Sequence, residues 1–392
     1  MKKFIEGSYA VAEAVRLCRP GVISAYPITP QTHIVEGLAD FVSNGDINCQ
    51  FVNVESEHSA ASVVLGASAA GVRVFTATSS QGLLYMNEVL FNIAGMRLPV
   101  VMVDANRAIS APINIWNDQQ DAISQRDTGW VQLYAENIQE SVDYTIQSYK
   151  LAENHKVMLP VMMNMDGFIL THGMETVDMP TQEQVDKFLP AYAAPYKLDV
   201  DNPMSFGLLG DPTIYLEARY SVQKTFEEII PLIPKIGKDF ESIFGRHGID
   251  LIERYKLEGA KTVIVAMGSV CGTIKEYVDR EREKGKAIGL LRVISYRPFP
   301  KEEIAGALEG ASKVLVLDKS ISLGSEGPLF TEVKSLISNK KPKVSGFVAG
   351  LGGRDITLDT IKSMVDISKK EVVRCKFLGL NESLLKEDFY VG

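Results

Sequence analysis

The sequence predicts an α/β protein with two units, each built on a parallel sheet that helices cover on both faces. In the first unit, short apolar strands alternate with helical patterns between residues 7 and 164. The same alternation begins again at residue 262. A proline-rich, acidic stretch over about 173–212 and a charged helical segment over 213–257 separate the two series. Buried strands that alternate with helices are typical of parallel sheets.

Each element of the first unit follows from an apolar pattern. Short runs of β-branched and apolar residues predict buried strands, whereas apolar residues three and four positions apart predict helices. In chain order these patterns predict a helix over 7–18, strand 21–25, a helix from Pro30 through Thr32 to Phe41, a strand from 51, a small-residue helix to 71, strand 73–78, helix 83–95, strand 99–103, helix 139–152 and strand 157–164.

A stiff corner follows the strand over 21–25. It reads Tyr26-Pro-Ile-Thr-Pro30, and its two prolines exclude a helix across it. Pro30 suits the first position of the next helix, because its missing N–H costs nothing there. The Thr29 hydroxyl is therefore expected to be exposed at a rigid strand-to-helix turn. Such a threonine suits an ordinary turn or a ligand contact, and the pattern leaves both open.

The stretch Phe51–Gly71 carries two carboxylates where a strand becomes a helix. An apolar, β-branched start predicts the strand, and the run of small residues after His58 predicts a helix that can lie close to another backbone. Glu55 and Glu57 lie at the junction, and their spacing places them on one strand face. Such an acid suits a helix start, which the helix dipole favours, or a buried position facing a cofactor. A Ser/Gly turn over 79–82 is a weaker ligand signal.

Another strand ends in a polar group of residues, Asp104-Ala-Asn106-Arg107. The guanidinium of Arg107 has donors suited to a carboxylate or a phosphate. The alternative is an ion pair of Arg107 with Asp104 or Asp118. The segment 108–118 is irregular and rich in apolar and amide side chains, so we expect it to form a pocket wall.

The second unit has four strand patterns, over 262–269, 287–294, 313–318 and 344–348. The glycine-rich Gly350–Arg354 follows the last of them, and such turns more often connect a strand tightly to a helix than bind phosphate. We expect a first domain over residues 1–240, with a helical link near 213–257, and a second domain over 241–392.

The composition is that of an ordinary globular protein. Of the 392 residues, 46% are hydrophobic and 23% are charged. The net charge is −8 without a basic block, so we expect no nucleic-acid partner. No run is long and apolar enough to span a membrane, and the N-terminus lacks the apolar core of a signal peptide. We therefore expect no membrane association and a cytoplasmic protein.

The cysteines and histidines indicate no metal site. The four cysteines lie far apart, without C-x-x-C spacing, at Cys18, Cys49, Cys271 and Cys375. They form neither a disulfide framework nor an iron–sulfur motif, and the five histidines show no ligand-like pairing. We expect this chain to hold no metal ion or cluster of its own and to work in a reducing compartment.

Three motifs carry a resemblance to a known family. They are Tyr26-Pro-Ile-Thr-Pro30, Glu55-Ser-Glu57-His58, and Asn106-Arg107 with the segment Ser110–Asp118. In these motifs, and over nearly the whole chain, the sequence resembles the α subunits of pyruvate:ferredoxin oxidoreductases. The first motif is shared by the wider 2-oxoacid:ferredoxin oxidoreductase family, whereas the third resembles the pyruvate branch more specifically.

The resemblance implies two thiamine-diphosphate-enzyme-like domains. One is an N-terminal pyrimidine-binding domain. The other is a transketolase C-terminal-like domain, which the second unit resembles through its segment Tyr296–Pro300. Thiamine diphosphate would be shared with a partner subunit that binds the diphosphate and Mg²⁺. Subunits that bind the diphosphate carry a Gly-Asp-Gly motif. The nearest matches in this sequence, Gly45-Asp-Ile47 and Gly210-Asp-Pro212, both lack its second glycine. The [4Fe-4S] clusters would also lie in partner subunits.

The resemblance also implies roles for three residues. Glu57 matches the glutamate that hydrogen-bonds the pyrimidine ring and shares a proton with it. Thr29 matches the threonine that contacts the substrate, and Arg107 matches the arginine that binds its carboxylate. Glu55 is the less suited acid, because the family pattern places the acid directly before the small-residue helix. These are the expected catalytic residues.

Further residues are expected around them. Tyr26, Pro27 and Ile28 belong to the same cofactor-binding motif, and Asn106 and Asn114 are expected to line the substrate wall beside Arg107. His58 departs from the small residue found after the glutamate in some relatives. It is suited either to tuning the pocket or to capping a helix.

The implied activity is the reversible conversion of pyruvate, coenzyme A and oxidised ferredoxin to acetyl-CoA, carbon dioxide and reduced ferredoxin. Subunits of β, γ and δ type and ferredoxin are the implied partners, and the chain alone should be inactive. Three alternatives stay open: a sibling subunit that acts on a branched-chain, aryl or larger 2-oxo acid, a non-catalytic scaffold subunit, and a self-sufficient enzyme of transketolase type. The broken diphosphate motif argues against the last.

Overall fold

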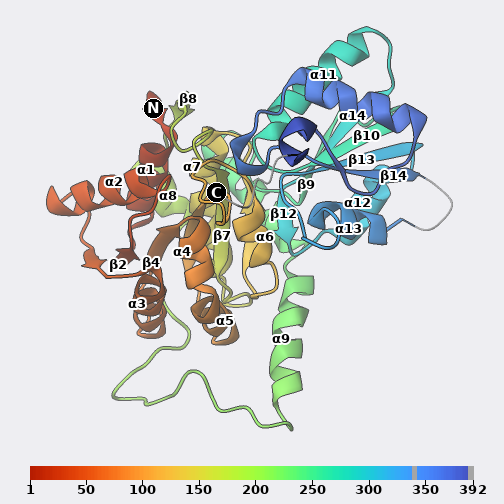
Figure 1. Cartoon of the computed structure of the whole chain (residues 1–392). Helices are drawn as coiled ribbons and strands as arrows, with labels where there is room; N and C mark the ends of the chain where they lie inside the picture. Colours follow the sequence, from red (N-terminus) through yellow and green to blue (C-terminus); the bar gives the residue numbers. More distant parts are fainter. Residues whose placement is uncertain (338–341, 387–392) are drawn as a thin grey trace. The chain divides into compact units, whose positions relative to one another are not determined.

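The computed structural model describes residues 1–337 and 342–386, and the chain divides into two compact α/β units (Figure 1). Unit 1 comprises Met1–Glu253, Met267–Ser269 and Val293–Glu303. Unit 2 comprises the intervening Arg254–Ala266 and Val270–Arg292 and the chain from Ile304 onward. Each unit contains its own sheet, as the alternation of strands and helices predicts.

Unit 1 is built on a seven-stranded sheet with the order β12-β6-β7-β5-β4-β2-β3. Its strands are β2 (Val22–Ala25), β3 (Gln50–Asn53), β4 (Val74–Thr78), β5 (Val101–Asn106), β6 (Val131–Tyr134), β7 (Val161–Asp166) and β12 (Ser295–Arg297). All pairs are parallel except β12 with β6. Every residue of β4, β5, β6 and β7 is buried, as expected for a sheet covered on both faces. A separate antiparallel pair joins β1 (Lys2–Glu6) to β8 (Met174–Asp178).

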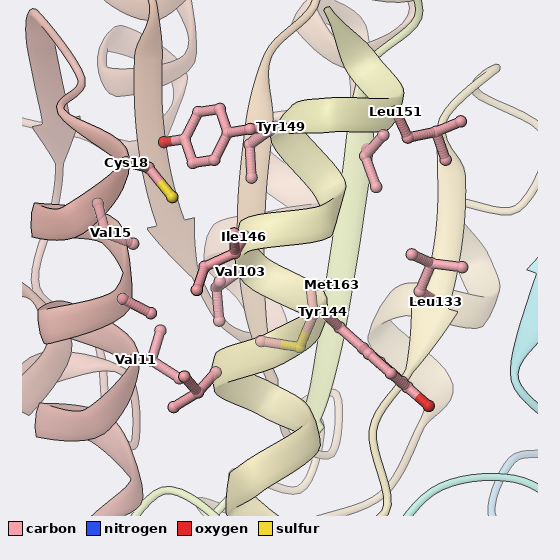
Figure 2. Packing of buried hydrophobic residues seen from close by; sticks show 14 of the residues in the cluster. Val11, Val15, Cys18, Val103, Leu133, Tyr144, Ile146, Tyr149, Leu151 and Met163 are labelled. Atoms are coloured by element: carbon pink, nitrogen blue, oxygen red, sulfur yellow. The ribbon is translucent and has the colours of Figure 1, made fainter. Parts of the chain in front are cut away.

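Along the chain, the helices of unit 1 alternate with these strands and continue after β8. They are α1 (Gly7–Cys18), α2 (Thr32–Ser43), α3 (Glu57–Ala69), α4 (Ser80–Tyr85), α5 (Asn87–Gly95), α6 (Gln120–Ser124), α7 (Ile138–Ala152), α8 (Gln182–Phe188), α9 (Tyr215–Glu228) and α10 (Leu232–Phe244). Figure 2 shows Val11 and Val15 of α1 and Ile146 of α7 packed beside Val103 and Met163 of the central strands. This apolar layer holds α1 and α7 against one face of the sheet.

Unit 2 is built on a six-stranded sheet with the order β15-β14-β13-β10-β11-β9. Its strands are β9 (Ile252–Tyr255), β10 (Thr262–Ala266), β11 (Ile288–Val293), β13 (Lys313–Asp318), β14 (Lys343–Val348) and β15 (Lys376–Phe377). The main helices are α11 (Val270–Glu283), α12 (Lys301–Leu308), α13 (Pro328–Ser335) and α14 (Leu358–Lys370), and short 3-10 turns lie at Leu351–Gly353 and Glu382–Lys386. A core that includes Ile264, Leu290 and Met364 joins the sheet to its helices.

Most predicted elements of both units are confirmed, but two helix starts were wrong. The helix over 7–18 has the predicted bounds. Pro30 does not open a helix: it lies in a turn, and α2 begins at Thr32. The helix predicted over 83–95 is divided at Met86 into α4 and α5, and α4 begins already at Ser80.

The proline-rich stretch after residue 173 is more structured at its start than predicted. It contains β8 and α8, and its long part without a helix or strand is confined to residues 189–214. Several apolar side chains of this later part are exposed, among them Val200, Leu208 and Leu209. Nowhere in the described ranges does a helix combine the length and the apolar character that crossing a membrane requires.

Candidate functional site

Four neighbouring strands of unit 1 end at the same edge of the sheet, and each is followed by polar groups. The order β5-β4-β2-β3 places these strands side by side, and all three pairings are parallel. Thr29 follows β2, Glu57 follows β3, a serine-rich turn over 79–82 follows β4, and Arg107 follows β5 directly. Because ligands of open α/β sheets bind at this edge, these strand ends form the candidate site.

Arg107 is held at this edge by backbone groups. Its Nη1 donates to the Thr29 carbonyl at 2.9 Å, and its Nε donates to the Asn114 carbonyl at 2.8 Å. The side chain is 6% exposed, and burial lowers the pKa of the guanidinium while the nearby Asp121 opposes that shift. Among the described residues, Nη2 has no acceptor and Arg107 forms no ion pair, since the bonds of its side chain go to the two carbonyl groups. The alternative of an ion pair with Asp104 or Asp118 is therefore not found, and a charged donor stays available to an anion.

The side chain of Gln31 fixes the turn Tyr26–Pro30, which carries Thr29. Gln31 is fully buried, its Nε2 donates to the Ala77 carbonyl of β4 at 2.6 Å, and its Oε1 accepts from the Ile28 N–H at 3.3 Å. Thr29 and Tyr26 are exposed at the surface of this corner. The predicted rigid corner with an exposed threonine is thus present, and Arg107 binds its backbone.

Glu57 opens α3 and is almost completely buried. It lies in the first turn of the helix, and the preceding Ser56 caps the helix by accepting the Ser59 N–H at 3.2 Å. Its side chain is 9% exposed, and no described residue donates a hydrogen bond to its carboxylate. The helix dipole favours a negative charge at this end. A buried carboxyl group without a donor is nevertheless costly, which indicates a place for a ligand donor.

The expectation that Glu55 and Glu57 share a strand face is wrong. The strand ends at Asn53, and Glu57 already belongs to the helix. Glu55 is exposed and accepts a short hydrogen bond from the Ser59 hydroxyl, which lowers the pKa of Glu55. Helix formation therefore turns Glu57 inward and leaves Glu55 in solvent.

Gly82 leaves space for the Glu57 side chain. A Cβ atom at Gly82 would lie 2.8 Å from Glu57 Oε1 and 2.5 Å from Thr78 Oγ1, so α4 approaches α3 too closely here for any side chain. The Thr78 hydroxyl is buried and has no hydrogen-bond partner in the described structure. The Glu57 carboxylate and the Thr78 hydroxyl are thus two polar groups without protein partners at the ends of neighbouring elements.

Asn106 does not lie on the open side of the strand end. It is fully buried, and its Nδ2 donates to Asp104 Oδ2 at 2.7 Å, to Asp121 Oδ1 at 3.2 Å and to Asn164 Oδ1 at 3.3 Å. The structure therefore places Asn106 behind Arg107 rather than on a pocket wall. Asn106 Oδ1 has no hydrogen-bond partner among the described residues, and a substrate contact from its side chain stays a prediction.

Asn114 and the loop around it are placed differently. The Asn114 carbonyl accepts from Arg107 Nε, and its Oδ1 accepts the Trp116 N–H at 2.8 Å. The loop over 107–119 contains neither helix nor strand, and its ends are buried. Its tip over 110–113 is exposed, so only part of the segment has the character of the predicted pocket wall.

The sequence motifs did not point to Asp121 or Gln31, and they gave Ser80 only as part of a weak turn signal, although all three organise this site. Asp121 accepts the backbone N–H groups of Arg107 and Ser80, at 2.8 and 3.0 Å. Ser80 has a left-handed backbone with φ of 48°. Gln31 is the third. A polar residue next to a proline or in an isolated turn gives no sequence signal for such contacts, because its partners lie elsewhere in the chain.

A cavity of about 390 Å³ lies at the amino ends of the strands, opposite the candidate site. Pro99 and Met158, which line it, precede β5 and β7, and Tyr192 and Tyr196 cover it. None of Glu57, Thr29 and Arg107 is among its lining residues. The cavity is therefore separate from the candidate site.

The polar groups at the carboxyl ends of these strands fit thiamine diphosphate. An aminopyrimidine ring offers ring nitrogens and an amino group, and Glu57 is a buried carboxylate that lacks a donor. Gly82 keeps side-chain atoms away from this position. Residues 13–237 match the family model described as pyruvate flavodoxin/ferredoxin oxidoreductase, thiamine diphosphate-binding. Unit 1 is thus a thiamine-diphosphate-binding domain of the kind found in oxidoreductases.

A second model extends this match into unit 2. Residues 260–361 match the pyruvate:ferredoxin oxidoreductase core domain II. The chain belongs to the pyruvate:ferredoxin oxidoreductase family, as the sequence motifs indicated.

Relatives with established names are similar over almost their whole length. The pyruvate synthase subunit PorA of Methanosarcina barkeri is 51% identical over 390 residues, which cover 97% of each chain. That of Methanothermobacter thermautotrophicus is 50% identical over 380 residues, covering 97% of this chain and 98% of the relative. The ketoisovalerate oxidoreductase subunit VorA of Pyrococcus horikoshii is 46% identical over 375 residues, covering 95% of each.

Two solved structures share the fold. The 2-oxoglutarate:ferredoxin oxidoreductase of Magnetococcus marinus matches with a TM-score of 0.72 at 22% identity over 93% of this chain, and this chain spans 65% of that one. A split-gene transketolase matches with a TM-score of 0.55 at 13% identity over 94% of this chain and 99% of the transketolase. These matches confirm the predicted fold of two α/β domains, and the family model of residues 13–237 assigns the first of them to thiamine diphosphate binding.

Proposed function

We propose that this chain is the α-type subunit of a pyruvate synthase. The complex would convert pyruvate, coenzyme A and oxidised ferredoxin to acetyl-CoA, carbon dioxide and reduced ferredoxin, reversibly. The observation that carries the proposal is the contact of Arg107 with the Thr29 backbone at 2.9 Å, because it joins the two residues expected to bind a small 2-oxo acid. The identities of 51% and 50% to pyruvate synthase subunits support the same substrate.

In this proposal Arg107 and Thr29 hold the substrate. The Arg107 Nη2 group, which has no acceptor in the described structure, donates to the carboxylate of pyruvate. The exposed Thr29 hydroxyl lies on the same corner and contacts the substrate from the side. A carboxylate held by a charged donor in a partly buried site is oriented for reaction until carbon dioxide leaves.

Glu57 acts on the cofactor side. Its carboxylate accepts a hydrogen bond from the pyrimidine ring and shares a proton with it, and Tyr26, Pro27 and Ile28 line the same corner. When bound, thiamine diphosphate supplies the nucleophilic carbon for attack on the 2-oxo group. The diphosphate and Mg²⁺ belong to a β-type partner subunit, and [4Fe-4S] clusters in partner subunits carry the electrons to ferredoxin.

The complex is proposed to contain β-, γ- and δ-type subunits, separate or fused, and to work in the cytoplasm. None of the four cysteines, all of which lie in described ranges, forms a disulfide, as suits a reducing compartment. We propose a boundary near residue 240 between a pyrimidine-binding and substrate domain and a transketolase C-terminal-like domain over 241–392, with the helical link near 213–257. This division is supported by the family models, which end at 237 and begin again at 260.

The experiment is ferredoxin reduction by the complex co-purified through a tag on this chain, with coenzyme A and either pyruvate or another 2-oxo acid. We expect pyruvate to be preferred. Preference for 2-oxoisovalerate or a bulkier acid would assign the chain to a sibling branch, such as that of the VorA relatives. No turnover of any 2-oxo acid by an intact, thiamine-loaded complex would leave a scaffold role. Turnover by this chain alone with thiamine diphosphate and Mg²⁺ would instead support a self-sufficient enzyme.

A further inference from the structure

Two carboxyl groups lie buried directly behind Arg107. Asp104 belongs to β5, Asp121 belongs to α6, and both are 0% exposed. Asn106 connects them, because its Nδ2 donates to one oxygen of each at 2.7 and 3.2 Å. Neither acid touches the open side of the site, and neither belongs to the three motifs that define the family resemblance. Their function must therefore be exerted through other residues.

Asp121 receives a set of donors that suits a charged carboxylate. Its Oδ2 accepts the N–H groups of Arg107 at 2.8 Å and Ser80 at 3.0 Å, and its Oδ1 accepts the Ala122 N–H at 2.8 Å. Donors around a carboxylate favour its ionised form. Burial, together with the nearby charge of the buried Asp118, raises the pKa of Asp121 to about 7, and the donors from Arg107, Ala122 and Ser80 act against that rise.

The environment of Asp104 favours the opposite protonation state. No backbone N–H donates to its carboxyl group, and Asn106 is its donor at Oδ2. Burial, followed by the nearby charge of Asp121, raises the pKa of Asp104 well above its ordinary value. Two like charges in a common buried site repel each other, and the three backbone donors favour placing a single shared charge on Asp121 rather than on Asp104.

Two of the three amides that donate to Asp121 belong to different parts of the site, one beside the expected substrate residue Arg107 and one in the helix that packs against Glu57. The Arg107 amide lies where β5 passes into the loop over 107–119. The Ser80 amide lies at the start of α4, and Ser80 is held in a left-handed conformation that is strained for an L-residue. Two residues further, Gly82 packs against Glu57. Ser80 Oγ also donates to the Ala108 carbonyl at 2.5 Å, which joins α4 to the residue after Arg107.

We propose that Asp121 is a positioning residue, a buried carboxylate that fixes Arg107 and the start of α4 relative to each other. It thereby sets the distance between the substrate anion at Arg107 and the Glu57 carboxylate beside α4. This inference rests on the proposed function for its substrate. The contacts of Asp121 themselves do not depend on that function. Asp104 serves as the neutral partner that keeps one charge in the pair.

The test compares the same substitution at the two acids in the assembled complex. In Asp121→Asn the amide offers one acceptor oxygen, while its NH₂ group meets a backbone N–H donor. We expect the KM for pyruvate to rise about 10-fold or more, with a smaller fall in kcat and an unchanged KM for coenzyme A. Asp104→Asn replaces a neutral group by a neutral isostere, so its KM should stay within about 3-fold of wild type. Equal effects of the two substitutions, or a larger effect at Asp104, would overturn the proposal.

A second readout is independent of turnover. Amide hydrogen exchange in the complex should become faster at Ser80 and Arg107 in Asp121→Asn and stay unchanged there in Asp104→Asn. If the wild-type complex does not use pyruvate, the proposed function fails, yet this contrast still tests the positioning. Unchanged exchange at both amides in Asp121→Asn would refute the positioning even if pyruvate is the substrate.

Asp121→Glu covers the case in which Asp121→Asn does not assemble with its partners. It keeps the charge but moves the carboxylate by one methylene group. We expect an increased KM for pyruvate with an unchanged melting temperature of the complex. A wild-type KM in this variant would overturn the proposal.

Discussion

Each of the two units contains a buried aspartate that accepts backbone N–H groups, Asp121 in unit 1 and Asp318 in unit 2, but the two acids hold different parts of the structure. In unit 1, Asp121 fixes the amide of Arg107, whose side chain keeps a donor for an anion. In unit 2, Asp318 ends β13 and accepts the N–H groups of Leu329 and Phe330, at 2.8 and 3.0 Å, at the start of α13. Both arrangements satisfy backbone donors, but only the first is connected to groups that face a ligand.

The comparison teaches that a shifted acidity alone does not mark a functional site. Burial raises the pKa of Asp121 and that of Asp318 to about 7 in both cases. Perturbed groups cluster at active sites, but structural caps are perturbed in the same way. The site in unit 1 differs in the residues that lie at the same strand ends as Asp121. Glu57 has no hydrogen-bond donor, Arg107 has a donor without an acceptor, and Thr29 is exposed.

The sharpest way to break this distinction is to neutralise Glu57. Glu57→Gln keeps the shape but removes the proton acceptor, so pyruvate-dependent ferredoxin reduction by the complex should fall about 100-fold or more. Glu55→Gln is the matched control, because Glu55 is exposed, and it should change the rate less than about 2-fold. A Glu57→Gln complex that kept wild-type activity would remove the reacting role from this edge and favour the scaffold alternative.

A milder change tests the packing around Glu57 without altering charge. In Gly82→Ala, the new methyl group would lie 2.8 Å from Glu57 Oε1, so the carboxylate must move and kcat should fall about 10-fold. Gly306→Ala in unit 2 is the control, since a Cβ atom there meets nothing within 4 Å. Steady-state kinetics of the two complexes decide the matter. Equal rates in both variants would mean that the position of Glu57 does not matter for turnover.

The smallest effect on activity is expected in unit 2. Asp318→Asn should leave kcat and KM within about 2-fold of wild type, because Asp318 caps a helix and contacts no predicted site residue. Loss of pyruvate turnover in a folded Asp318→Asn complex would show that the unit 2 acid is not merely a cap.

Asp318 should instead influence stability as a function of pH. Its folded pKa of about 7 lies above the ordinary 3.8, so the protonated folded state is favoured. The resulting stabilisation is complete below about pH 4 and is lost as the pH rises through 7. The melting temperature of wild type relative to Asp318→Asn should therefore be higher at pH 5 than at pH 8, as thermal unfolding of the full chain would reveal. An equal difference at both pH values would contradict the shifted pKa.

The fold was predictable where a pattern is long or strongly apolar. The amphipathic α1 was predicted with its observed bounds, and the buried strands β2, β4 and β13 within about one residue. The four-residue β6 was missed because it is too short to show a period. The charged β1 was missed because its strand character depends on pairing with β8, more than 160 residues away in sequence.

The site was predictable only where a single residue type suits a ligand. Thr29, Glu57 and Arg107 were proposed from their chemistry, their place at strand ends and the family resemblance, and the structure brings their strands together. Asp121 and Gln31 could not be predicted, because they act through backbone groups 14 and 46 positions away, respectively. Contacts of this kind depend on the tertiary fold and leave no local pattern.

The most direct test of the account is the KM for pyruvate of an Arg107→Ala complex. Loss of a charge-assisted hydrogen bond to a carboxylate predicts an increase of about 10- to 100-fold. The KM for coenzyme A and the occupancy of thiamine diphosphate should stay unchanged. A wild-type KM for pyruvate in this variant would contradict the assignment of the substrate anion to the carboxyl edge of the unit 1 sheet.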